Sequence, residues 1–84
     1  MITWNYRVIH VTETWEDQVF DDHHCIKVIY YQDGVIASSH ENPHAPIGDD
    51  PEDLKREMEL MMQAFEKPVI HEQQGKLVEL GQKI

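Results

Sequence analysis

The chain has 84 residues, of which 40% are hydrophobic and 27% charged, and its net charge is −9. This length fits one domain with a single small core, and the composition is that of a folded globular protein. The negative charge argues against nucleic acid and anionic membranes as partners, because both bind basic surfaces. The negative charge is compatible with a basic protein partner.

The chain has one cysteine, Cys25, so no disulfide framework can hold the fold together. Its first residues form neither a basic leader nor the apolar stretch of a secretory signal. Its apolar runs are far shorter than the ~20 residues that cross a bilayer as a helix. We therefore expect a cytoplasmic protein of bacterial character that does not bind a membrane.

Alternation with a period of two predicts a first strand over residues 3–11, where Trp4, Tyr6 and Val8 share one side. We expect Trp4 to belong to the core. The acidic stretch 12–22 has no clear period and predicts a loop that regains extended structure only at residues 19–20.

Two further strands are predicted over residues 23–32 and 35–40, joined by Asp33-Gly34. An Asp-Gly pair between two β-rich runs is typical of a type I′ hairpin turn, because both turn positions need positive φ. A two-residue turn fixes the register. The cross-strand partners it predicts are Tyr31 with Ile36, Tyr30 with Ala37, and Lys27 with His40.

A helix is predicted over residues 51–66, before Pro68. Asp50 can cap it, Pro51 suits its first turn, and acidic residues follow where the helix dipole favours them. Because a helix cannot bury an apolar stripe alone, we expect this one to lie on the sheet. Its stripe consists of Leu54, Met58, Met61, Met62 and Phe65.

These elements predict an α+β domain over residues 1–70, in the order β-β-β-α. Its sheet is antiparallel and three-stranded, with one amphipathic helix packed on one face. A four-stranded sheet is the alternative, since residues 68–71 can supply an extended piece. Residues 71–84 are predicted as a C-terminal tail, for which a short helix, a strand and partial disorder all stay open.

Six histidines raise the question of a metal site. Extending the hairpin register brings His44 towards His23, so His23, His40 and His44 are the candidate ligands. No His or Cys spacing typical of zinc sites is present, and we expect no metal and no cofactor.

The motifs of nucleophilic catalysis are also missing. Ser38 and Ser39 do not lie in a G-x-S-x-G turn, and Cys25 lies within a strand beside His24, which points to the opposite face. The acidic helix start repels an anionic ligand. The sequence therefore predicts that the protein is not an enzyme.

Trp15 is the candidate interaction residue, because it lies in an acidic segment and tryptophan is frequent among interface hot spots. The alternative is that Trp15 folds back over the edge of the core.

Residues 4–9, 26–34 and 48–54, with Lys67-Pro68 after the helix, resemble a family of short uncharacterised bacterial proteins. The resemblance covers about residues 3–70. The order of the elements is similar to that of the N-terminal domain of HicB-type antitoxins. This implies a three-stranded antiparallel sheet with the helix on one face, and neither resemblance supplies catalytic residues.

The function that these observations favour is that of a non-enzymatic protein-interaction module, and the resemblance implies that it is antitoxin-like. Such a module contacts a basic protein or pairs with itself as a homodimer through a free sheet edge. The alternative is a domain that binds a small ligand or a metal through the histidines at the open end of the hairpin.

Overall fold

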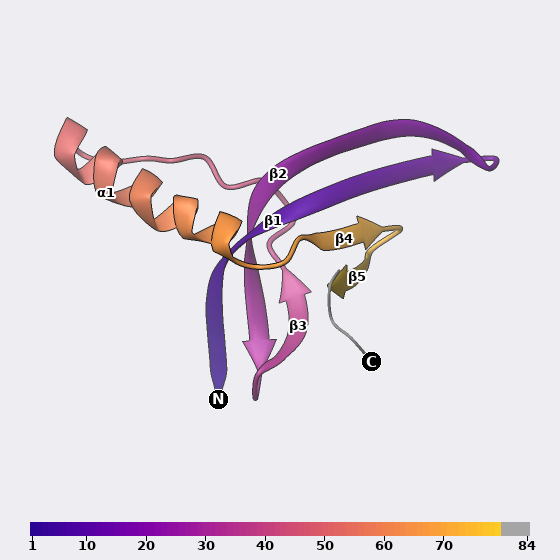
Figure 1. Cartoon of the computed structure of the whole chain (residues 1–84), viewed down its shortest axis with the longest axis horizontal. Helices are drawn as coiled ribbons and strands as arrows, with labels where there is room; N and C mark the ends of the chain where they lie inside the picture. Colours follow the sequence, from indigo (N-terminus) through magenta and orange to yellow (C-terminus); the bar gives the residue numbers. More distant parts are fainter. Residues whose placement is uncertain (80–84) are drawn as a thin grey trace.

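The structure is a computed structural model and describes residues 1–79. Its elements are β1 (Ile2–Trp15), β2 (Gln18–Gln32), β3 (Val35–Ser39), α1 (Pro51–Met62), the 3-10 helix η1 (Gln63–Glu66), β4 (Ile70–Gln73) and β5 (Lys76–Glu79). The strands form one sheet in the order β3-β2-β1-β4-β5. β1 and β4 are parallel, whereas the other neighbours are antiparallel. Figure 1 shows a long, bent β1–β2 hairpin with α1 projecting on one side and β4–β5 on the other.

The predicted three-stranded antiparallel sheet with a helix on one face is wrong. The sheet has five strands and is mixed, and two of its strands follow the helix. The helix does not cover a face either: Met58, Met62 and Phe65 are 51%, 61% and 63% exposed. Contact with the sheet is made chiefly by η1 against β1. Most of the predicted stripe therefore stays at the surface.

The predicted loop over residues 12–22 is also wrong, because β1 and β2 run through it. Thr12 pairs with Asp22 and Trp15 pairs with Gln18, around a two-residue turn at Glu16-Asp17. Both turn residues have positive φ, of 50° and 65°, as a type I′ hairpin turn requires. A register shift between Glu13 and Thr14 interrupts the pairing, which explains why the sequence shows no clean alternation there.

The predicted turn at Asp33-Gly34 is confirmed, with φ of 53° and 83°. The pairing of Tyr31 with Ile36 is confirmed too. Beyond it, a register shift between Tyr30 and Tyr31 changes the partners. Tyr30 pairs with Ser38 and not with the predicted Ala37. His40 lies opposite Val28 and not opposite the predicted Lys27, since its amide donates a hydrogen bond to the Val28 carbonyl.

The predicted helix start is confirmed. α1 begins at Pro51, and the side chain of Asp50 accepts a hydrogen bond from the Asp53 amide at 2.8 Å. The segment predicted as a tail contributes all of β5 and most of β4. Its last part, residues 80–84, lies outside the described residues.

The core is formed by four aliphatic residues from three strands: Ile9, Val11, Ile29 and Ile70. Ile36 of β3 and Leu77 of β5 both pack against it, although these strands form opposite edges of the sheet. The sheet therefore curls, and its two edges bend around the same core.

Two cations lie on this concave side. Arg7 and Lys27 are opposite each other in the β1–β2 register and are only 3% and 5% exposed. Lys27 donates to both carboxylate oxygens of Glu72 at 3.2 Å. Each buried cation is therefore paired with a carboxylate from β4 or β5, as burial of charge requires.

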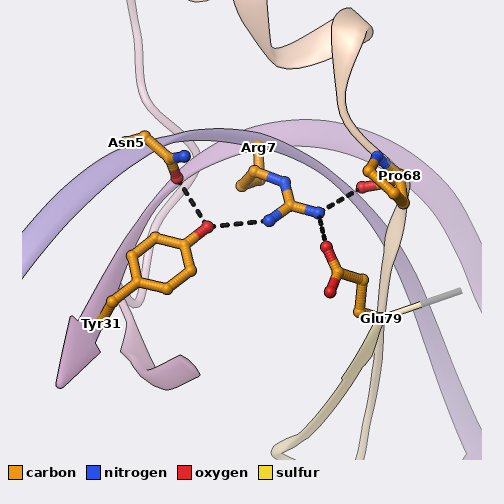
Figure 2. A network of polar contacts seen from close by, with 5 residues as sticks. All are labelled: Asn5, Arg7, Tyr31, Pro68 and Glu79. Carbon is orange, nitrogen blue, oxygen red and sulfur yellow. Dashed lines mark hydrogen bonds and ion pairs between the residues drawn. The ribbon is translucent and has the colours of Figure 1, made fainter. Parts of the chain in front are cut away.

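Figure 2 shows how Arg7 joins distant parts of the chain. Its guanidinium donates to the Tyr31 hydroxyl at 2.8 Å, to the Pro68 carbonyl at 2.6 Å and to the Glu79 carboxylate. The Tyr31 hydroxyl donates in turn to Asn5 at 2.8 Å. Burial alone would lower the pKa of Arg7, but the hydrogen bonds to Glu79 and Tyr31 raise it above its ordinary value.

Replacing Glu79 should therefore destabilise the fold strongly. We expect Glu79→Ala to lower the free energy of unfolding by about 3–5 kcal/mol, because it leaves the Arg7 charge buried and uncompensated. Urea denaturation measures the loss. The control is Arg56→Ala, which removes an ion pair whose arginine is 74% exposed and should cost less than about 1 kcal/mol. Equal losses in the two variants would contradict the role given to the Arg7 cluster.

Candidate interaction surface

The end of the β1–β2 hairpin extends beyond the rest of the sheet. β4 pairs with β1 only from Ile9 to Thr12, whereas β1 continues to Trp15. We call residues 13–22 the arm; in Figure 1 it carries the hairpin turn away from the other elements. Trp15 and Val19 near its tip are 71% and 60% exposed.

A groove lies where the arm leaves β4 and β5. Its volume is about 290 Å³, and we call it the Trp15 groove. Its lining residues come from β1 and from the β4–β5 hairpin: Val11, Thr12, Glu13, Thr14, Trp15, Glu72, Gln74 and Gly75. Gln74 Nε2 donates to Thr14 Oγ1 at 3.4 Å, so the hairpin turn contacts the base of the arm.

The arm is acidic throughout. It carries five carboxylates and no lysine or arginine, and the sequence has neither cation between Arg7 and Lys27. The five are Glu13, Glu16, Asp17, Asp21 and Asp22. The surface around Trp15 therefore combines exposed apolar area with negative charge.

Three histidines meet on the convex side of the sheet, and sequence reasoning missed this cluster. His10 and His24 are cross-strand partners, and their rings stack at 4.4 Å. His10 Nδ1 lies 2.9 Å from His71 Nδ1, and His10 Nε2 contacts Asp22. The parallel pairing of β1 with β4 places His71 beside His10, and no local sequence pattern predicts that pairing. Both nitrogens of His10 are occupied by hydrogen bonds, so this ring offers no free ligand atom.

The predicted ligand candidates are not gathered into a site. His23 contacts Asp21 at 3.1 Å, and His40 bonds to the backbone of Asn42. His44 instead points to β1 and the helix. Within residues 1–79, no group of three or more His, Cys, Asp or Glu side chains could hold a metal ion.

His44 belongs to a cluster that fastens the helix to β1. Glu57 of α1 accepts hydrogen bonds from the Tyr6 hydroxyl at 2.5 Å and from His44 Nε2 at 2.7 Å. Burial and the bond to Glu57 raise the pKa of Tyr6 to about 12. The bonds from Tyr6 and His44 hold the pKa of Glu57 below its ordinary value. Both shifts lead away from neutral pH, so the cluster suits attachment better than acid–base catalysis.

A second apolar area surrounds the helix. Trp4, which was predicted to be a core residue, is 56% exposed. With Leu60 it lines a hollow of about 190 Å³ between β1 and the helix. Met58, Met62 and Phe65 add further exposed apolar surface.

Cys25 packs against the core from β2, and burial raises the pKa of its thiol. A raised pKa lowers the thiolate fraction at neutral pH, so this cysteine lacks the character of a reactive thiol.

In comparisons with family models, curated proteins and solved structures, nothing matches this chain. The helices within residues 1–79 are too short and too polar to cross a membrane.

The attachment of the helix should depend on acid pH through Glu57. Because its folded-state pKa is lowered, Glu57 stabilises the fold above its ordinary pKa of 4.5, and this contribution is lost as pH falls through the folded-state value. Glu57→Gln removes the titrating group. We expect the stability difference between wild type and Glu57→Gln, measured by urea denaturation, to shrink between neutral pH and pH 3.

The control is Glu59→Gln on the exposed side of the same helix. It should show no comparable change with pH. A stability difference for Glu57→Gln that stays constant from neutral pH to pH 3 would refute the role of ionised Glu57 in attaching the helix to β1.

Proposed function

We propose that this chain is a non-enzymatic protein-interaction module that binds a basic protein partner through its arm and the Trp15 groove. The observation that carries the proposal is the exposure of Trp15, 71% of which remains accessible on the wall of a groove. An indole exposed to water beside a groove is energetically unfavourable, and burying it under a partner contributes strongly to the free energy of binding.

The charge of the arm supports a basic partner. Five carboxylates with no interspersed lysine or arginine create a negative potential, which attracts cationic surfaces and repels nucleic acid and anionic lipid. Histidine or metal chemistry receives no such support, because the candidate histidines each bind different neighbours.

The antitoxin resemblance adds nothing to this proposal. It implied a three-stranded sheet covered by a helix, and the sheet has five strands with the helix mostly uncovered. The proposal rests on the arm alone.

The proposal predicts a partner whose capture depends on Trp15. We expect tagged wild-type protein to capture from its native cell a basic protein that Trp15→Ala loses and Trp4→Ala retains. Both variants remove one exposed tryptophan, so Trp4→Ala is a matched control. Capture should also weaken as salt is raised, because the attraction is between exposed charges. A partner retained by Trp15→Ala would rule out the arm as the binding surface.

Self-association through the helix is a second candidate, favoured by three exposed apolar side chains that share one side of α1 and η1 at helical spacing. They are Met58, Met62 and Phe65. Half of a large side chain is roughly 100 Å², so three such side chains in each of two copies could cover about 600 Å². That is the area of a weak, transient contact rather than of a standard interface.

Light scattering after size exclusion tests this candidate. If copies pair through the helix, Met62→Glu should convert dimers to monomers, because it places a charge in the apolar contact. Gln32→Glu adds the same charge at the far end of β2 and should leave the dimer intact. A wild-type chain that stays monomeric at high concentration would exclude the dimer.

A further inference from the structure

We infer that the Trp15 groove receives an arginine side chain from an extended, basic segment of the partner. This inference rests on the proposed function and adds to it the chemical identity of the group that is bound.

The size of the groove favours a single side chain. Sites for small molecules and cofactors span ~300–1,000 Å³, and the Trp15 groove, at about 290 Å³, lies at the bottom of that range. It is also open on the arm side, where Glu13 and Trp15 are exposed. A side chain that enters from a neighbouring chain fits such a shape better than an enclosed ligand does.

The lining of the groove favours a cation. Trp15 supplies an indole, the aromatic group that attracts cations most strongly across its face. Glu13 supplies a carboxylate that forms no ion pair within residues 1–79. Glu72 also lines the groove, but both its oxygens are held by Lys27. Glu13 is therefore the carboxylate available to a ligand.

Arginine matches this lining better than lysine does. Its guanidinium is planar, so it can stack on an indole while its edge donates to a carboxylate. An ammonium group is a compact, strongly hydrated charge and gains less from stacking. The chain's own nearby cations cannot fill the groove, since Arg7 and Lys27 are buried and paired. Lys76 follows the β4–β5 turn but is not a lining residue.

The backbone beside the groove favours an extended partner segment. The β1–β4 ladder ends where Thr12 meets Gln73, and β1 continues through residues 13–15 paired with β2 on its other side only. The outward edge of these residues is open to one more short strand. A segment lying along this edge would place alternate side chains towards the groove.

Fluorescence titration of short peptides tests the inference. In a Trp4→Phe background, Trp15 is the remaining tryptophan, so its emission reports on the groove. The probes are blocked nonapeptides in which threonine alternates with arginine, lysine or citrulline. Citrulline keeps the shape of arginine but removes its charge. Two variants alter the groove, Trp15→Ala and Glu13→Gln. Peptide binding to Trp15→Ala is measured by calorimetry, because this variant lacks the fluorescent indole. Glu59→Gln is the control for Glu13→Gln, because it removes the same charge elsewhere.

We expect the arginine peptide to bind at least threefold more tightly than the lysine peptide and tenfold more tightly than the citrulline peptide. Trp15→Ala should weaken binding of the arginine peptide at least tenfold. Glu13→Gln should weaken this binding more than Glu59→Gln does. Equal affinity for arginine and lysine, or equal effects of Glu13→Gln and Glu59→Gln, would overturn the inference.

The two proposals fail in different ways. If cellular capture depends on Trp15 while the peptides show no preference for arginine, the proposed function stands and the arginine site is refuted. If Trp15→Ala does not change capture, the proposed function is refuted, and the arginine site, which rests on it, is refuted too.

Discussion

The guanidinium of Arg7 sets the shape of this protein, because it is buried in a core too small to enclose it with apolar groups alone. Its partners come from β2, from the backbone before β4 and from β5. A charge in this position must be hydrogen-bonded on several sides, or its burial becomes prohibitive. The sheet meets this requirement by curling until Glu79 reaches Arg7 from beyond β4. The Lys27–Glu72 pair repeats the same solution one strand away.

Burying two ion pairs has a consequence for the apolar residues. Four aliphatic side chains fill the center of the core, and polar groups occupy positions that a sheet usually gives to aliphatic ones. The helix covers only part of the sheet: Met61 and Ala64 are buried, and a polar cluster of Tyr6, His44 and Glu57 adds to its attachment. Met58, Met62 and Phe65 remain at the surface, where they are available to other molecules.

The sequence predicted well those features that are decided by neighbouring residues. The turn at Asp33-Gly34 follows from backbone conformation, and the helix start follows from Asp50 and Pro51. It predicted poorly what distant residues decide. An apolar stripe indicates that a helix has something to bury, but it does not say whether a sheet is there to receive it. The Trp15 groove and the histidine cluster both depend on the parallel pairing of β4 with β1, for which the sequence holds no local signal.

The groove itself arises from a difference in strand length. β1 has 14 residues and β4 has four, so the hairpin continues where its parallel neighbour stops. If β4 were as long as β1, it would cover the edge beside Trp15 and fill the hollow. If the β1–β2 hairpin ended at Thr12, Trp15 and the arm carboxylates would be absent. The β1–β2 hairpin continues past Thr12, near the point where β4 ends. This one extension supplies the free edge, the Trp15 indole and the arm carboxylates, so all three occur together.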